Sequence, residues 1–170
     1  MAEETITEQV HQGQQWLERL LDLAGMPAPV QVDTSRLETE GSCWLIIGRE
    51  ELSDTQVENL LGNRGHALDA IQYLANTTLN MGGTPDTQCA YTIELDGYRA
   101  RRQVELEAIA QAAVDEVRSS GEEHEIRDLS SAERRQVHTM VKAYDDVTTE
   151  SRGREPDRRL VVKLKSSEEQ

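Results

Sequence analysis

The sequence predicts an α+β fold in which helices alternate with short strands. Apolar residues recur at helical spacing in several segments, and the two longest begin near residues 5 and 98. Between the helical segments lie short runs of Val, Ile and Leu that are bounded by Gly, Pro or polar turn residues. Phe is absent and aromatic residues make up 4% of the chain, so any core has to be aliphatic. A length of 170 residues allows one domain or two small ones.

In the first half of the chain the expected order is helix, strand, strand, helix, loop, helix, strand. Ser53 or Asp54 suits the N-cap of the second helix, and Gly82-Gly83 ends the third. The third helix is expected to bury one face, made by Ala67, Leu68, Ile71, Leu74, Ala75 and Thr78. The ranges are 5–24, 53–61 and 67–81 for the helices, and 30–32, 42–47 and 88–95 for the strands.

In the second half a long helix over 98–119 is expected to end at Gly121. Its buried side is expected to carry Val104, Ala108, Ile109, Ala112 and Val117. Ser130 or Ser131 caps a further helix, and Glu133 stands where a capping box needs it. The remaining ranges are a helix reaching about 143, strands over 124–126, 147–151 and 160–164, a turn over 152–157, and a disordered tail over 166–170.

The segment Gly62-Asn63-Arg64-Gly65 joins two of the expected helices and suits contact with a phosphate chain. Glycine on both sides allows a tight turn and a close approach of another backbone. The following helix presents N–H groups and the positive end of its dipole beside the loop, and Arg64 adds a cation. The alternative is an ordinary connection between helices, with Gly62 as a C-cap.

A second candidate site lies in the helix after Ser131. Arg134 and His138 are four residues apart and therefore share a helix face, and Arg158 and Arg159 follow on the last strand. Arg134 could grip a phosphate with its planar fork of donors, while His138 donates another hydrogen bond or stacks on a base. The alternative is a solvated helix face on which these residues pair with Asp or Glu.

The charge of the chain is unevenly distributed. The formal net charge is −14, with 4 basic and 16 acidic residues over 1–96, but 14 basic and 16 acidic residues over 97–170. An acidic first half opposes nucleic-acid binding by the glycine loop. Arginines at 99, 101 and 102 stand in the first turn of the long helix, where cations oppose the dipole. They are expected to meet either a bound anion or acidic neighbours.

The sequence argues against a membrane protein, a secreted protein, a metal site and an enzyme. The apolar runs are too short to insert into a membrane, and the acidic N-terminus does not have the pattern of a secretory signal. Cys43 and Cys89 lack metal-binding companions and are expected to be buried thiols in a reducing cytoplasm. No catalytic motif is present, so we expect neither an enzyme nor a cofactor or metal site.

Four segments in order give the chain a recognisable resemblance. They are LDAIQYL at 68–74, DGYRARR at 96–102, ERRQVH at 133–138 and GREPDRR at 153–159. Together they resemble the Jag (SpoIIIJ-associated) family of bacterial RNA-binding proteins. Residues 43–80 resemble a bacterial-type (type II) KH domain with its Gly-x-x-Gly loop, and residues 131–164 resemble the R-3-H domain, named for an Arg and a His separated by three residues.

The resemblance implies two small α/β sandwich domains joined by a long helix: a KH domain over 1–97, an R-3-H domain over 98–165 and the tail. It implies that the chain lacks the extra N-terminal domain of many family members. It also implies contact with single-stranded RNA, or with single-stranded DNA as a second ligand. The contact residues that it implies are Gly62, Asn63, Arg64, Gly65, Arg134, His138, Arg158 and Arg159.

The function implied is that of a cytoplasmic, post-transcriptional and chaperone-like regulator linked to cell envelope growth, division and cell shape. The chain departs from the family because Arg64 is the one cation within its glycine loop and the preceding segment is acidic. Fewer cations weaken phosphate binding and make it more sensitive to salt. The alternative function is therefore a protein-interaction module that pairs with another small KH protein and has little RNA affinity of its own.

Overall fold

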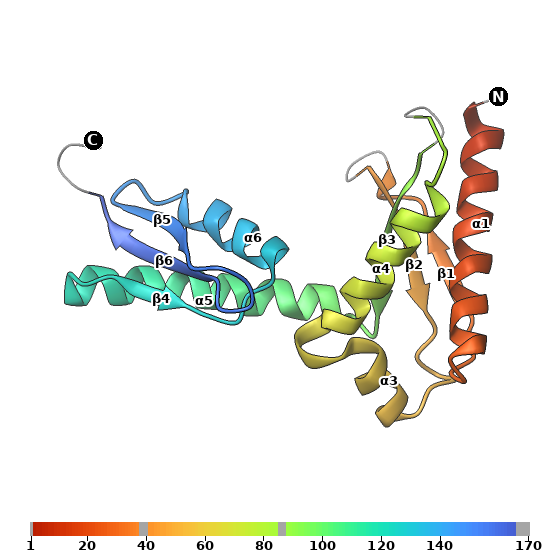
Figure 1. Ribbon diagram of the computed structural model, residues 1–170, viewed down its shortest axis with the longest axis horizontal. Helices are drawn as coiled ribbons and strands as arrows, with labels where there is room; N and C mark the ends of the chain where they lie inside the picture. Colours follow the sequence, from red (N-terminus) through yellow and green to blue (C-terminus); the bar gives the residue numbers. More distant parts are fainter. Residues whose placement is uncertain (1, 38–40, 85–87, 166–170) are drawn as a thin grey trace. The chain divides into compact units, whose positions relative to one another are not determined.

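The computed structural model describes residues 2–37, 41–84 and 88–165. The chain divides into two compact units, Met1–Arg99 (unit 1) and Ala100–Gln170 (unit 2). Each unit combines helices with its own three-stranded sheet (Figure 1). The expected α+β class is confirmed.

Unit 1 contains one mixed sheet with the strand order β1-β2-β3. Strands β1 and β2 are antiparallel, with Val30 opposite Ile47, whereas β2 and β3 are parallel, with Leu45 opposite Ile93. The order of elements agrees with the order expected from the sequence. The elements are α1 (Ala2–Leu23), β1 (Val30–Asp33), β2 (Ser42–Ile47), α3 (Asp54–Leu61), the 3₁₀ turn η1 (Asn63–Gly65), α4 (His66–Leu79) and β3 (Ala90–Leu95).

The core of unit 1 is aliphatic and lies between the sheet and the helices α1 and α4. Leu17 and Leu21 of α1 are fully buried against Leu45 and Ile93 of the sheet. Gly13 allows α1 to lie directly on the ring of Tyr91, because a Cβ at this position would overlap that ring. The Tyr91 hydroxyl donates to the Gln9 carbonyl at 2.7 Å, which links the helix to the strand.

Side chains of α4 form hydrogen bonds with the outer edge of β3. Asn76 donates to the carbonyl of Tyr91 and accepts from its N–H, at 2.8 and 2.9 Å. Asn80 forms the same pair of bonds with Cys89, both at 2.8 Å, and Gln72 accepts from the N–H of Ile93 at 2.9 Å. These three amides lie one helical turn apart and satisfy backbone groups that an edge strand otherwise presents to solvent.

This use of α4 corrects the buried face expected from the sequence. Leu68 and Ala75 are buried, but Leu74 is 49% exposed and Thr78 is also exposed. Part of the helix surface that faces the sheet is occupied by amides, so the apolar residues on the other side of the helix remain in solvent.

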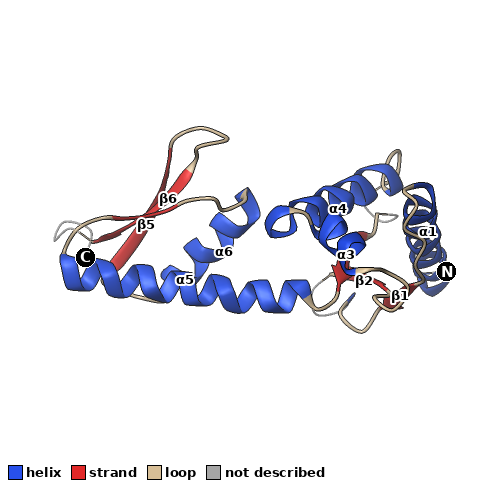
Figure 2. Cartoon of the chain, turned by 90° about the horizontal axis from the view of Figure 1, so that it is seen from below, coloured by secondary structure: helices blue, strands red, loops and turns tan. Residues whose placement is uncertain are grey.

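Unit 2 contains an antiparallel sheet with the strand order β4-β6-β5. In its ladders Ile126 lies opposite Leu160, and Val147 lies opposite Leu164. The turn between β5 and β6 closes the hairpin that can be followed in Figure 2. The elements are α5 (Tyr98–Ser120), which begins in unit 1, β4 (His124–Ile126), α6 (Ser131–Val141), β5 (Val147–Arg152) and β6 (Arg159–Leu164).

The buried side of α5 differs from the expected one. Val117 is buried as expected, but Val104 is 65% exposed, and Ala108 and Ala112 are also exposed, while Ile109 is half-buried. The apolar stripe that packs on the sheet and α6 is rotated by about one residue from the expected stripe. Both stripes repeat at helical spacing, so the spacing alone could not decide between them. That stripe consists of Leu106, Ala110, Ala113, Val114 and Val117.

Other local expectations are confirmed. Ser53 caps α3 and Ser130 caps α6, each in a capping box, the second one with Glu133. Two of the three arginines in the first turn of α5 meet acidic neighbours, which was one of the two expected outcomes: Arg99 binds Asp69 at 3.2 Å, and Arg102 binds Glu133 at 2.7 Å.

Cys43 and Cys89 are both buried, reduced thiols, as expected. Burial raises the pKa of the Cys43 thiol to about 11. Within the described residues, we find no helix with the length and apolar character that a membrane span needs. The expected disordered tail over 166–170 lies outside the described residues.

The corrected face of α5 predicts opposite outcomes for two substitutions on one helix. Leu106→Ala should lower the free energy of unfolding by about 2–5 kcal/mol, because it opens a cavity in a packed core. Val104→Ala removes an exposed side chain and should change it by less than about 0.5 kcal/mol. Urea denaturation of both variants provides the test. Similar losses from both would contradict the observed face.

Candidate nucleic-acid interface

The glycine loop of unit 1 forms a tight connection between α3 and α4. Gly62 ends α3 with a φ of 66°, and its N–H donates to the carbonyl of Glu58 at 2.8 Å. A Cβ at Gly62 would lie 2.7 Å from that of Ala67, so glycine is required by the close approach as well as by φ. Arg64 adopts the left-handed conformation, with a φ of 51°, and is exposed together with Asn63.

Gly65 lies directly against the first residue of α5. Its φ is 77°, and a Cβ there would overlap the ring and hydroxyl of Tyr98. Gly65 is also the N-cap residue of α4, and no side chain caps this end of the helix. The loop therefore presents backbone beside a helix N-terminus, which is the arrangement expected for contact with a phosphate chain.

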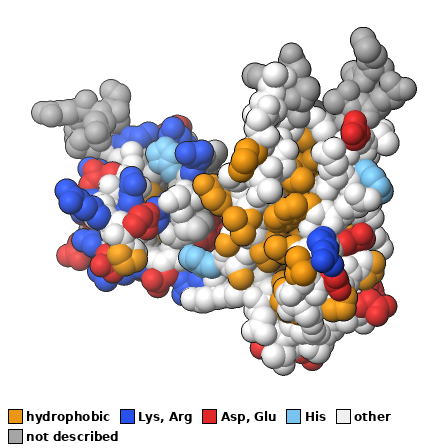
Figure 3. Space-filling model, turned by 45° about the vertical axis from the view of Figure 1, so that its right-hand side comes forward, with side chains coloured by type: hydrophobic (Ala, Val, Ile, Leu, Met, Phe, Trp, Pro, Cys, Tyr) orange, Lys and Arg blue, Asp and Glu red, His pale blue; other side chains and the backbone are white. Residues whose placement is uncertain are grey.

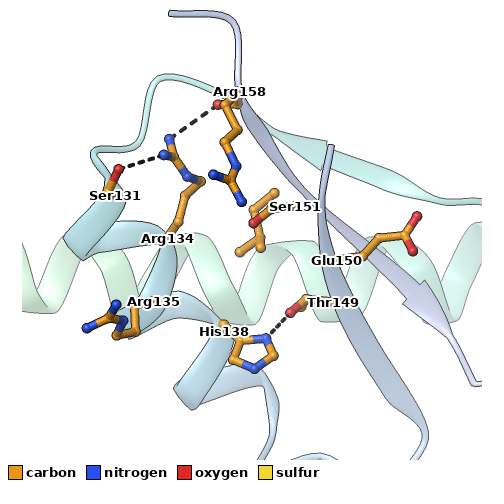
Figure 4. A pocket seen from close by; sticks show the side chains of 9 residues that line it. Ser131, Arg134, Arg135, His138, Thr149, Glu150, Ser151 and Arg158 are labelled. Carbon is orange, nitrogen blue, oxygen red and sulfur yellow. Dashed lines mark hydrogen bonds between the residues drawn. The ribbon is translucent and has the colours of Figure 1, made fainter. Parts of the chain in front are cut away.

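Unit 2 contains a pocket of about 330 Å³ between α6 and the β5–β6 hairpin. Arg134 and His138 line it from α6, and Arg158 lines it from the turn just before β6 (Figure 4). The structure thus brings together three of the four residues expected for the second site. The other lining residues are Ser131, Arg135, Thr149, Glu150, Ser151 and Leu160.

Arg159, the fourth residue, does not line this pocket. Its Nε donates to Glu125 of β4 at 2.8 Å. Leu160, the next residue of β6, lines the pocket, and neighbouring residues of a strand point to opposite faces, so Arg159 faces away from the pocket. A contact between Arg159 and nucleic acid stays a prediction.

His138 and Arg134 are both engaged inside unit 2. A ring nitrogen of His138, Nδ1, shares a hydrogen bond with the hydroxyl of Thr149. Arg134 is 5% exposed, and its guanidinium donates to carbonyl, hydroxyl and carboxylate oxygens of the protein. Its alternative role, on a solvated helix face, is excluded by this burial, although an acidic partner, Glu155, is present.

The start of α6 is held in place by a partly buried ion pair. Glu133 accepts from Arg102 of α5 at 2.7 Å and from the N–H of Ser130 at 2.7 Å. Burial by itself would raise the pKa of Glu133, but the bonds from Arg102 and Ser130 outweigh it and lower the pKa below its ordinary value. The helix that carries Arg134 and His138 is therefore anchored at its first turn.

Sequence reasoning missed the contribution of β5 to the pocket. Thr149 and Ser151 line it because they lie on the same side of the strand as buried Val147. The alternation along 147–151 could have placed them on one face, but only the packing of α6 on that face shows that they meet Arg134 and His138. Arg135 is exposed beside them on α6.

The pocket has the composition of an anion site and not of a metal site. Three arginines line it against a single carboxylate, Glu150, which points away from them in Figure 4. Glu150 is itself paired with Arg152 and lies 3.5 Å from Lys163. Among the described residues, no three His, Cys, Asp or Glu side chains form a group that could hold a metal ion.

Comparison with known proteins identifies the second half of the chain. Residues 104–164 match the R-3-H domain, the same domain that the resemblance names. A protein of Clostridium symbiosum named RNA-binding protein KhpB is 26% identical over 151 residues, 89% of this chain and 64% of that protein. Proteins of the same name from Lactiplantibacillus plantarum and Bacillus subtilis are 32% identical over 113 residues and 26% identical over 119 residues.

These matches confirm the resemblance to Jag-type proteins. The Lactiplantibacillus match covers 66% of this chain and 34% of that protein, and the Bacillus match covers 69% and 56%. The chain thus spans between about a third and two thirds of the length of these curated relatives.

The contact between Gly65 and Tyr98 can be tested against a second glycine. Gly82 has a similar φ, 78°, but no atom lies within 4 Å of the position of its Cβ. Gly82→Ala should therefore cost only about 1–2 kcal/mol of backbone strain. Gly65→Ala should destabilise unit 1 by clearly more than Gly82→Ala does, because its Cβ also displaces the ring of Tyr98. Thermal unfolding measures both losses, and equal losses would show that the ring contact is unimportant.

Proposed function

We propose that this chain, which carries an R-3-H domain and is related to the bacterial RNA-binding proteins KhpB, binds single-stranded RNA. The observation that carries the proposal is the arginine-lined pocket between α6 and the β5–β6 hairpin, inside the residues that match the R-3-H domain. Single-stranded nucleic acid offers a protein two kinds of contact: a negatively charged phosphate chain, and bases that are free to stack and to form hydrogen bonds.

The residues of the pocket suit these two parts of the ligand. Arg135 and Arg158 are exposed at its rim and present guanidinium groups that match phosphate geometry. The hydroxyl of Ser151 and the ring of His138 offer hydrogen bonds or a stacking surface to a sugar or base. Affinity is thus expected to come from a local concentration of cations, although unit 2 as a whole is not basic.

For unit 1 we infer the KH role implied by the resemblance. Supporting it are the order of its elements and the bare backbone of the loop from Gly62 to Gly65. KH loops of this kind clamp about four nucleotides through their backbone. The acidic surroundings and one cation, Arg64, predict that unit 1 contributes less affinity than the pocket of unit 2. The domain limits 1–97 and 98–165, and the eight contact residues, stay predictions.

The wider role proposed is that of a non-enzymatic, cytoplasmic regulator that acts on transcripts and influences envelope growth, division and cell shape. The support for it is the resemblance to the Jag family. Single-stranded DNA remains a second ligand of the same chemistry, and a comparison of RNA with DNA of one sequence separates the two.

A second candidate function is a protein-interaction module, and one observation favours it. Tyr73 and Leu74 on α4 and Met81 just after it are 70%, 49% and 75% exposed. In Figure 3, hydrophobic side chains gather on the face of unit 1 that is in view. An exposed apolar surface of this kind suits another protein, including the small KH protein considered from the sequence.

The RNA proposal predicts selective losses on removal of rim arginines. Arg135→Gln and Arg158→Gln should each weaken binding of a fluorescent single-stranded RNA by roughly 3- to 10-fold. Each should also reduce the slope of log K against log salt concentration by about 0.7, because one phosphate contact is lost. Fluorescence anisotropy at low and physiological salt provides both quantities.

Arg127→Gln is the matched control, since Arg127 is an exposed arginine of unit 2 that pairs with Glu125 and lies outside the pocket. It should leave affinity nearly unchanged. Arg64→Glu tests unit 1 in the same titration and should weaken binding by a smaller factor. Absence of binding by the wild-type chain at either salt concentration would refute the proposal.

The second candidate predicts association that depends on α4. Wild-type protein should form dimers or retain a partner protein, and replacement of both Tyr73 and Leu74 by Ser should abolish this without unfolding, because both side chains are exposed. Size-exclusion chromatography with light scattering measures the mass. A monomer at all concentrations, with no retained protein, would exclude the interaction role.

A further inference from the structure

Arg134 is the more deeply buried of the two residues that define the R-3-H motif. It is 5% exposed, whereas Arg135, its neighbour on α6, is exposed. The phosphate-gripping role expected from the sequence requires the guanidinium to present its donors outward. The structure shows those donors pointing into the protein instead.

The guanidinium of Arg134 joins three separate segments of unit 2. Nη1 donates to the carbonyl of Leu129, before α6, at 2.6 Å, and lies 3.3 Å from the carbonyl of Arg158, just before β6. Nη2 donates to the hydroxyl of Ser131 at 2.9 Å and to the carboxylate of Glu155, in the β5–β6 turn. Figure 4 shows Arg134 between Ser131 and the backbone of Arg158.

The residues held by these bonds include the cations that remain available. Arg158 carries one of the acceptor carbonyls, and Arg154 directly precedes Glu155 in the turn. Within the part of the chain that the structure describes, the guanidinium groups of Arg135, Arg154 and Arg158 make no hydrogen bond or ion pair with protein. All three are exposed.

We propose that Arg134 is a positioning residue, which holds the β5–β6 turn against α6 through Glu155 and the Arg158 carbonyl so that Arg135, Arg154 and Arg158 face one phosphate chain. This inference rests on the proposed RNA binding and assigns its phosphate contacts to the exposed arginines. Arg134 contributes through their placement and not through contact of its own. Preorganised cations bind more tightly, because less conformational freedom is lost on binding.

Glu155 distinguishes this role from a simple effect of charge. Removing a carboxylate beside an RNA site should strengthen binding if only the Coulomb energy matters. Removing the acceptor that holds the turn should weaken binding if position matters. Glu155 is also the safer residue to change: its side chain is 58% exposed, whereas replacing Arg134 would strip the donor from a buried carbonyl and risk unfolding.

The experiment compares Glu155→Ala with Glu155→Gln in the full chain, using the fluorescent single-stranded RNA as the probe. Both variants lose the charge, but only Gln keeps an oxygen that can accept from Arg134. Asp157→Ala, in the same turn, reports the effect of charge alone, since the Asp157 side chain makes no bond in the described structure. Thermal unfolding is measured for each variant.

Glu155→Ala should weaken binding about 3- to 10-fold and make the salt slope shallower, because correctly placed phosphate contacts are lost. Glu155→Gln and Asp157→Ala should bind as tightly as the wild type or more tightly. Each variant should still unfold in one cooperative transition well above the temperature of the binding assay, although Glu155→Ala loses some stability because Arg134 is buried. This separates misplacement of the arginines from loss of the fold.

Equal affinities for Glu155→Ala and Glu155→Gln, with a wild type that binds RNA, would overturn the positioning role and leave the RNA proposal intact. A wild-type chain that binds no RNA would overturn both.

Discussion

Both units depend on polar side chains of a helix to satisfy backbone groups of neighbouring segments. In unit 1, Gln72, Asn76 and Asn80 bond to the outer edge of β3. In unit 2, Arg134 bonds to the carbonyls of Leu129 and Arg158. A buried backbone group without a partner costs about 1–3 kcal/mol, so these side chains fix where each helix sits on its sheet.

The aliphatic composition of the cores has consequences for the surface. Without Phe, the core of unit 1 is filled mostly by Leu, Ile and Val, and its buried aromatic ring, Tyr91, lies directly on Gly13 of α1. Helix α4 uses one side for amide bonds and a narrow stripe for the core. Its remaining apolar residues stay exposed, which makes the same helix a source of stability and a candidate surface for a partner.

The arginines around the pocket and the start of α6 have two different roles. Arg102 and Arg134 are enclosed and bind oxygens that hold the fold together. Arg135 and Arg158 are exposed on the pocket. A net charge of −14 is therefore compatible with a local anion site, because several acidic residues are already neutralised by arginines elsewhere, as in the pairs of Glu123 with Arg152 and Asp146 with Arg118.

Local sequence was sufficient to predict the order of elements, the N-caps of α3 and α6, the capping box of α6 and the glycine turn. Each of these depends on local spacing, dihedral preference or side chains a few residues apart. The motif of Arg134 and His138 could be found in the same way. The predicted buried face of α5 was wrong by about one residue, because helical periodicity alone does not say which of two neighbouring apolar stripes packs on the sheet. The packed structure was needed to show that Arg134 points inward, that Arg159 faces Glu125 and that Thr149 joins His138, because those positions depend on which segments distant in sequence pack together.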